Sequence, residues 1–110
     1  MSPRSDLLPG TLDLIVLRVL SLGPRHGYGI AVRIRQISQE VLQVNQGSLY
    51  PALLRLEQRG WIKSYWGATD TSREAKFFEL TRAGRRQLGV ETENWERIKG
   101  AIGRLMEAVE

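Results

Sequence analysis

The sequence predicts a mainly α-helical domain with one small β-hairpin, an α+β fold. Four segments of the 110-residue chain carry the hydrophobic patterns of helices. Two runs rich in aromatic and β-branched residues, 61–66 and 75–80, flank a polar segment, which is the pattern of a hairpin. The chain is 42% hydrophobic and 25% charged, as ordinary globular proteins are, and its length suits a single core. These values exclude a disordered, collagen-like or low-complexity chain.

The first predicted helix begins near Thr11. The hydroxyl of this threonine is suited to cap the helix, and Asp13 lies in the first turn, where the helix dipole favours negative charge. The following residues are apolar on nearly every side until Gly23 and Pro24 end the helix. Such a helix must be covered on more than one face, so another subunit is a candidate for the second cover.

The second predicted helix is amphipathic. After a glycine-rich start, Ile30, Ile34 and Ile37 recur at helical spacing, which predicts a helix of about ten residues. Residues 41–44 are β-branched in part and are expected to form a short strand.

A third helix is predicted from about residue 47 to residue 59. Asn45 is a natural N-cap, and Gly60 suits the position just beyond the C-terminal end. The buried stripe consists of Leu49, Leu53 and Leu56. The residues that project away from it are Gly47, Ser48, Pro51, Arg55 and Gln58, with Tyr50 on the flank.

The hairpin leads into a long last helix. The loop of residues 67–73 between the two predicted strands is too long for a tight turn. Thr81 is expected to cap a helix that runs almost to the C-terminus. From residue 95 its apolar residues are spaced three and four apart, as in a coiled-coil seam. They are Trp95, Ile98, Ile102, Leu105 and Val109.

This order of elements is that of a winged helix-turn-helix domain with an appended helix. We therefore expect a DNA-binding unit over residues 1–80 and a dimerisation helix over residues 81–110, together forming one structural domain. Residues 1–90 carry thirteen basic and seven acidic side chains, whereas residues 91–110 carry three and five. A basic body favours a nucleic-acid partner.

Several other classes of function are excluded or disfavoured. The chain has no cysteine, which excludes disulfides, thiolate metal sites and a cysteine nucleophile. His26 is its single histidine, and it is expected to cap a turn or, alternatively, to contact phosphate. No phosphate-binding glycine-rich loop occurs, so we expect neither an enzyme, nor a metal site, nor a cofactor. The start lacks the pattern of a secretory signal, and no segment suits a membrane span, so a cytoplasmic protein is expected.

Five short segments carry a resemblance to a known family. They are residues 10–14 (GTLDL), 26–30 (HGYGI), 46–53 (QGSLYPAL), 56–60 (LEQRG) and 80–84 (LTRAG). Together they closely resemble the PadR family, bacterial transcriptional regulators named for phenolic-acid repressors. The resemblance covers roughly residues 8–105. The short C-terminal region of the chain is similar to that of the subfamily with a single C-terminal helix.

The resemblance implies a homodimer joined through the first and last helices. It also implies that the third helix enters the major groove of double-stranded DNA while the wing touches phosphate or the minor groove. Two features depart from the family pattern. The second wing strand has Lys76 followed by two phenylalanines where tyrosines are usual, and Arg73 is followed by Glu74 instead of a second arginine.

The third helix supplies most of the predicted DNA contacts. Gly47 and Ser48 allow a phosphate to approach the helix N-terminus, and Tyr50 is suited to contact phosphate, sugar or a thymine methyl. The amides of Asn45 and Gln46 suit adenine edges. The complete predicted set is Tyr28, Asn45, Gln46, Gly47, Ser48, Tyr50, Pro51, Arg55, Arg73 and Lys76.

Trp95 has two interpretations. It is a core or dimer residue at the head of the seam, or an aromatic platform for a flat ligand. Some PadR-like dimers resemble this chain in placing a tryptophan from each last helix at a central pore, which implies a planar aromatic effector held by Trp95, Ile15 and Ile98. The predicted dimer residues are Leu12, Ile15, Val19, Trp95, Ile98, Ile102, Leu105 and Val109.

The predicted function is that of a sequence-specific transcriptional regulator, a repressor rather than an activator. A homodimer is expected to bind a palindromic operator with half-sites one helical turn apart and to be released by a small planar ligand. In a bacterial cytoplasm it would associate with the nucleoid when bound to DNA. The alternative is a winged-helix module for protein–protein interaction without specific DNA binding.

Overall fold

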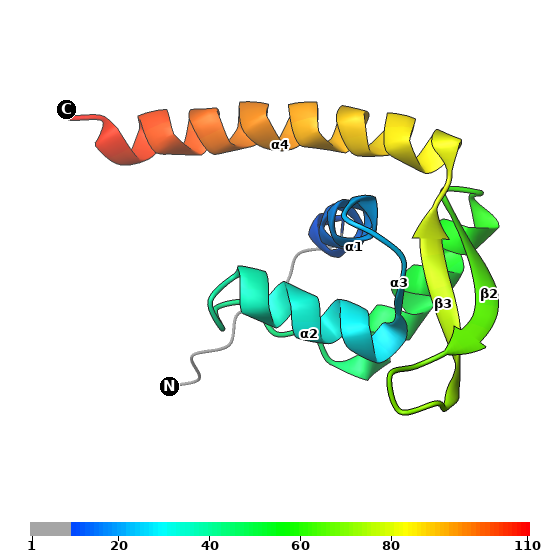
Figure 1. The fold of residues 1–110 in the computed structure, drawn as a ribbon. Helices are drawn as coiled ribbons and strands as arrows, with labels where there is room; N and C mark the ends of the chain where they lie inside the picture. The colour runs from blue at the N-terminus through cyan, green and yellow to red at the C-terminus, as the bar shows by residue number, and fades with distance from the viewer. Residues whose placement is uncertain (1–9) are drawn as a thin grey trace.

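A computed structural model describes residues 10–110 of the chain, and its fold is the predicted α+β type (Figure 1). Residues 1–9, for which no secretory signal was predicted, lie outside the described residues. In chain order the elements are α1 (Thr11–Ser21), β1 (Arg25–His26), α2 (Gly27–Ile37), α3 (Gln46–Gln58), β2 (Ile62–Ala68), β3 (Glu74–Leu80) and α4 (Arg82–Glu107). Among the described residues, no helix is both long enough and apolar enough to span a bilayer.

The three strands form one antiparallel sheet in the order β1-β3-β2. The predicted hairpin is confirmed, and its register pairs Ile62 with Leu80 and Ala68 with Glu74. The third strand, β1, was not predicted, because two residues are too few to show an alternating pattern. It attaches the start of α2 to β3, since Arg25 pairs with Phe78.

The core lies between the helices and the sheet, with α1 at its centre (Figure 1). α1 packs against α2, α3, α4 and β3, so its own chain supplies much of the cover that an all-round apolar helix requires. Leu12 and Val19 are only 9% and 4% exposed. These two predicted dimer residues are thus already buried within the chain and have little surface left for a partner.

The start of α1 differs from the prediction. Thr11 is the first helical residue and not the cap, and no side chain caps this helix. The N-cap is Gly10, whose φ of 89° is a left-handed conformation that glycine adopts without steric cost. The Gly10 carbonyl accepts the first helical hydrogen bond from the amide of Leu14 at 3.1 Å.

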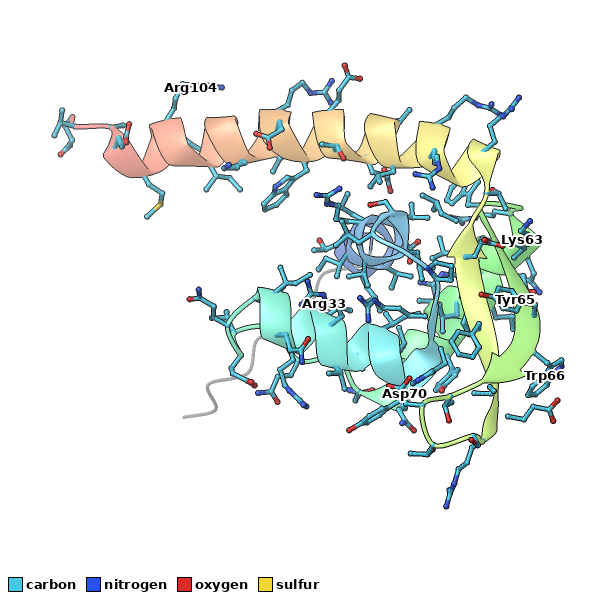
Figure 2. All side chains as sticks on the ribbon, in the orientation of Figure 1. Arg33, Lys63, Tyr65, Trp66, Asp70 and Arg104 are labelled. Atoms are coloured by element: carbon cyan, nitrogen blue, oxygen red, sulfur yellow. The ribbon has the colours of Figure 1, made fainter. Side chains whose placement is uncertain are left out.

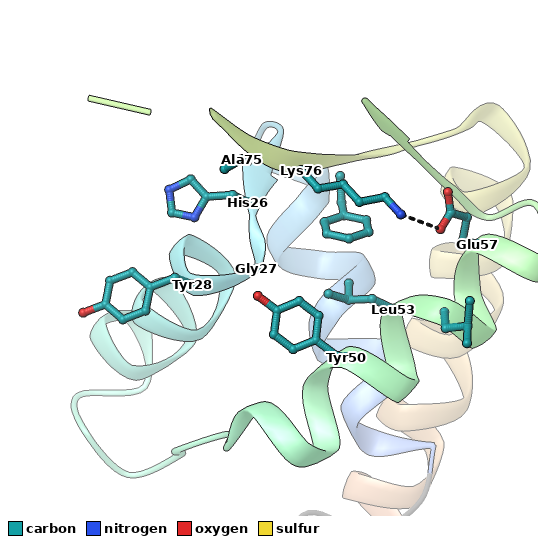
Figure 3. A pocket seen from close by; sticks show the side chains of 10 residues that line it. His26, Gly27, Tyr28, Tyr50, Leu53, Glu57, Ala75 and Lys76 are labelled. Carbon is teal, nitrogen blue, oxygen red and sulfur yellow. Dashed lines mark ion pairs between the residues drawn. The ribbon is translucent and has the colours of Figure 1, made fainter. Parts of the chain in front are cut away.

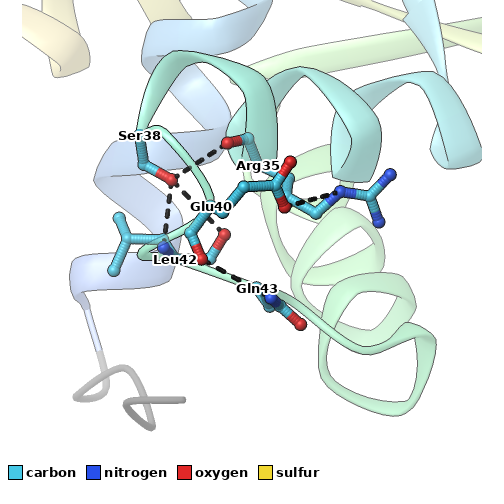
Figure 4. A network of polar contacts seen from close by, with 5 residues as sticks. All are labelled: Arg35, Ser38, Glu40, Leu42 and Gln43. Atoms are coloured by element: carbon cyan, nitrogen blue, oxygen red, sulfur yellow. Dashed lines mark hydrogen bonds and ion pairs between the residues drawn. The ribbon is translucent and has the colours of Figure 1, made fainter. Parts of the chain in front are cut away.

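The predicted strand over residues 41–44 is also wrong. The Ser38 hydroxyl accepts a hydrogen bond from the amide of Leu42 at 3.0 Å (Figure 4). Gln39 and Glu40 take left-handed φ values of 53° and 70°, and the Glu40 carboxylate lies 3.4 Å from Arg35 Nε. These local bonds turn the chain between α2 and α3 and replace the strand pairing that would have satisfied the backbone.

The predicted ends of α3 and α4 are confirmed. The Asn45 side chain accepts from the Ser48 amide at 2.9 Å, and Gly60 follows α3 with a φ of 76°. The Thr81 hydroxyl accepts from the Gly84 amide at 3.0 Å and donates to the Gly60 carbonyl at 2.7 Å. This threonine therefore joins the end of α3 to the beginning of α4, whose outer half extends beyond the body of the domain (Figure 1).

Candidate nucleic-acid interface

α3 presents a polar face to solvent. Leu49, Leu53 and Leu56 are buried, which confirms the predicted stripe. The exposed residues of the helix are Gln46, Gly47, Ser48, Tyr50, Pro51, Leu54, Arg55 and Gln58. The first turn of the helix is therefore free of covering residues from the described chain, and its amides and dipole favour an anion such as phosphate.

Tyr50 is held in place by the start of α2. Its ring reaches Gly27, where an added methyl group would overlap the phenol (Figure 3). Tyr50 is still 46% exposed, so it is both fixed from behind and open to a ligand in front. This contact gives a physical reason why the HGYG and GSLYP segments occur in the same chain. Gly27 of the first segment leaves room for the ring of Tyr50 in the second. The exposed Tyr28 lies beside them.

A cleft of about 300 Å³ separates α3 from the hairpin (Figure 3). Tyr50, Leu54 and Glu57 line it from α3, and Lys76 lines it from β3. The Lys76 ammonium lies 4.0 Å from a Glu57 oxygen, and the Ser64 hydroxyl donates to the other oxygen of the same carboxylate. Glu57 therefore ties the wing to α3 and neutralises Lys76, which lies inside the cleft instead of at the wing tip.

The wing tip is a closed turn. Its strands continue to Ala68 and from Glu74, so the loop is shorter than predicted. The amide of Thr69 donates to the Arg73 carbonyl at 2.7 Å, and the Arg73 amide donates to the Thr69 hydroxyl at 3.2 Å. Arg73 is exposed at the end of this turn, so its side chain is available to an anion.

Arg55 has an intramolecular partner. Its guanidinium lies 2.9 Å from Asp13 Oδ1, and Arg59 lies 4.0 Å from Oδ2 of the same carboxylate. Asp13 is only 7% exposed. The ion pair with Arg55 therefore joins α1 to the C-terminal half of α3 at a buried carboxylate. Any contact of Arg55 with DNA would have to be made with its guanidinium already paired. Sequence reasoning attributed Asp13 to the helix dipole and missed this pairing.

We expect the substitution Asp13→Asn to lower the free energy of unfolding by about 1–2 kcal/mol, because it removes a buried charge from a pair whose arginine is partly screened by solvent. The measurement is urea unfolding monitored by fluorescence. The matched control is Glu79→Gln, which breaks the more exposed pair with Lys63 at 3.6 Å and should change stability by about 0.5 kcal/mol or less. Equal effects of the two substitutions would refute a structural role for the Asp13–Arg55 pair.

His26 caps α2, as one of its two interpretations predicted. Its Nδ1 accepts from the amide of Gly29 at 3.0 Å, and its ring meets the edge of Phe77 with 5.4 Å between centroids. The described residues contain no group of three or more histidine, aspartate and glutamate side chains arranged to hold a metal ion.

An apolar groove of about 870 Å³ runs between α1, the end of α2 and α4. Ile15 and Val19 line it from α1, and Trp95 lines it from α4. Ile98, the third residue of the predicted ligand site, does not line it and lies exposed farther along α4. Ile102 and Leu105 of the predicted seam are also exposed. The inclusion of Val109 in the seam is wrong, because α4 ends at Glu107 and the chain is extended from Ala108.

Two exposed apolar residues were missed by sequence reasoning. Leu54 lines the cleft between α3 and the wing, and Trp66 lies on β2 opposite Lys76, which also lines this cleft. Leu54 had a detectable signal, since it falls off the Leu49–Leu53–Leu56 stripe. Trp66 was considered only as one of the aromatic residues whose pattern predicted a strand.

A helix that follows a shorter helix and lies exposed beside a β-hairpin defines the winged helix class of DNA-binding domains. Within that class, the chain belongs to the PadR-like family of transcriptional regulators, which matches residues 16–90. It is thus a DNA-binding transcriptional regulator and not an enzyme.

Similar proteins cover almost the whole chain. Uncharacterized protein X of Lysinibacillus sphaericus is 31% identical over 107 residues, which is 97% of this chain and 98% of that protein. The structure of a transcriptional regulator from Clostridium thermocellum has a TM-score of 0.81 at 34% identity, covering 91% of this chain and 97% of that one. A PadR family transcription regulator from Clostridium difficile has a TM-score of 0.75 at 27% identity, covering 86% and 97%.

Proposed function

We propose that the protein is a homodimeric repressor that binds a palindromic operator through the two copies of α3. The observation that carries this proposal is the exposed first turn of α3, held by Tyr50 against Gly27 and flanked by the wing. The predicted contacts Asn45, Gln46, Gly47 and Ser48 lie at or before this turn, Pro51 lies in the next turn, and all five are exposed. Such a helix end suits the major groove, with neighbouring phosphates at its amides.

The dimer is supported by the surface of α4. Trp95, Ile98, Ile102 and Leu105 are 44–74% exposed and follow the spacing of a helix–helix seam. So long an apolar seam needs cover, and the groove lined by Ile15 and Trp95 supplies a matching apolar surface on a second copy. In this arrangement residues 1–80 bind DNA and residues 81–110 join the subunits.

The groove also supports a role for an effector. Its volume of about 870 Å³ is within the range of small-molecule sites, and the Trp95 ring offers a flat apolar face. A planar ligand seated there would alter the packing between subunits and shift the dimer away from the spacing that the operator requires. A repressor of this kind would act in the cytoplasm and associate with the nucleoid when bound to DNA.

The alternative is a winged-helix module that binds proteins. It is disfavoured by the basic charge of residues 1–90, which carry thirteen basic and seven acidic side chains. Fluorescence anisotropy with the DNA upstream of the protein's own gene, beside a scrambled duplex of equal length, tests both functions. Preference for the upstream duplex, with affinity that falls steeply with salt, supports the repressor. Absence of binding even at low salt supports the protein-interaction module.

Tyr50→Ala is expected to weaken operator binding about tenfold or more, because it removes the aromatic contact at the first turn of α3. Tyr50→Phe keeps the ring on Gly27 and loses only the hydroxyl, so it should show a smaller loss. The measurement is anisotropy at constant salt, with sedimentation to establish that both variants remain dimers. If the Tyr50→Ala variant bound the operator with unchanged affinity, α3 would not be the helix that contacts the operator.

A further inference from the structure

Trp66 is an unusually exposed tryptophan on the wing. Its side chain is 68% exposed and projects from the outer strand β2 (Figure 2). Side chains alternate along a strand, so Ser64 and Trp66 share one face of the sheet with the buried Ile62. The Ser64 hydroxyl bonds to Glu57 of α3, which identifies this face as the one turned toward α3. Trp66 is therefore the next residue along the wing on the α3 side.

The strand beneath the indole is firmly held. Trp66 pairs with Lys76 of β3, and the ladder continues past it to the pair of Ala68 and Glu74. On the opposite face Tyr65 stacks on Phe77 with 5.7 Å between the ring centroids. The ring is thus carried on a paired strand, which lowers the entropic cost of using it as a contact.

The surroundings of Trp66 favour a neutral contact over a salt bridge. Lys76, directly across the ladder, already has the carboxylate of Glu57 as its partner. Leu54 of α3 is 56% exposed on the other side of the same cleft. Trp66 does not line the cleft itself but lies beside it, opposite the lining residue Lys76. Together Trp66 and Leu54 offer an indole N–H, a flat aromatic face and an aliphatic side chain, which suit a phosphate oxygen and the apolar edge of a deoxyribose.

We propose that Trp66 binds the sugar–phosphate backbone of the DNA strand that passes between α3 and the wing. The proposal rests on DNA binding through α3. It follows from the continuity of the cleft with the exposed face of α3 and from the exposed Arg73 at the wing tip, which attracts the same backbone. A contact of this kind is independent of base sequence, so it adds affinity for every duplex and leaves the preference for the operator unchanged.

The experiment compares Trp66→Ala with Tyr65→Phe, which changes the opposite face of the same strand but keeps the ring stacked on Phe77. Anisotropy is measured on the operator and on the scrambled duplex at several salt concentrations. We expect Trp66→Ala to lose about tenfold in affinity on both duplexes. Its salt dependence should match that of the wild type, since no charge is removed, whereas loss of a cationic phosphate contact lowers the slope by about 0.9. Tyr65→Phe should bind as the wild type does.

Trp66→Phe provides a second measurement that does not depend on a large truncation. It should bind more tightly than Trp66→Ala, because it keeps an aromatic face, and the quenching of indole fluorescence by DNA should be reduced relative to the wild type. Equal affinities of the wild type and Trp66→Ala on both duplexes would refute the contact with DNA. The exposed indole would then be a candidate contact for a protein partner instead. Failure of the wild type to bind any duplex would refute the proposed function as well.

Discussion

Gly84→Ala is expected to lower the free energy of unfolding by about 3 kcal/mol or more and to detach the start of α4 from the sheet. The added methyl group would overlap the carbonyl oxygen of Trp61 and approach Leu80. The carbonyl has little freedom to retreat, because it accepts a hydrogen bond from the Thr81 amide at 3.0 Å. The measurement is urea unfolding monitored by fluorescence and circular dichroism.

The matched control is Gly89→Ala in the same helix. Apart from its chain neighbours and the nearby backbone of its own helix, a methyl group on Gly89 meets no atom of the described residues within 4 Å. Alanine is a better helix former than glycine, so this variant should be stabilised by about 0.5–1 kcal/mol. If the two glycine-to-alanine substitutions change the free energy of unfolding with opposite signs, the close packing is specific to Gly84. A Gly84→Ala variant as stable as the wild type would contradict the close approach of α4 to Trp61.

Ile102→Asp is expected to give the second large effect, the conversion of the proposed dimer to a monomer. It places a carboxylate in the centre of the apolar seam, where a partner helix would have to desolvate the charge. We expect the dimer dissociation constant to rise about 100-fold or more. Sedimentation at several protein concentrations measures it. The fold of the subunit should be preserved, because Ile102 is 52% exposed in the isolated chain.

Arg104→Gln is the control for this substitution. It changes the net charge by the same amount, and Arg104 points away from the body of the domain (Figure 2). The control should therefore remain dimeric. If Ile102→Asp also remains dimeric, the subunits meet elsewhere. If both variants dissociate, charge alone and not the apolar seam governs the association.

Local chemistry explains why so many helix ends were predictable. Asn45 and Thr81 each bond to a backbone amide three residues ahead, a pattern written in adjacent sequence. Strand β1 was missed because its two residues are defined by pairing with a strand some fifty positions later. The error at residues 41–44 has the opposite cause, since Ser38 offered the backbone a side-chain partner that strand propensity does not consider.

The candidate site was predictable to the extent that it lies on one helix. The exposed face of α3 follows from the positions of Leu49, Leu53 and Leu56, and it was placed correctly. The interactions that hold this face in position join distant parts of the chain. An example is the hydrogen bond from Arg55 to Asp13. A single sequence contains no periodic signal for such pairs, because each partner has a satisfactory local explanation. Only the folded arrangement reveals that they meet.

Thr81 has a mechanical consequence. Its hydroxyl bonds to Gly60 after α3 and to Gly84 within α4, so the reading helix and the long helix share a stiff joint. α4 has 26 residues and at 1.5 Å per residue is about 39 Å long. Because this joint is stiff, a change in the tilt of α4 is transmitted to α3. A tilt of about 5° moves the far end by about 3 Å, close to the 3.4 Å rise between successive bases of one strand. In the proposed dimer, a small change in the packing between the two α4 helices would therefore displace α3 relative to the DNA by about one base.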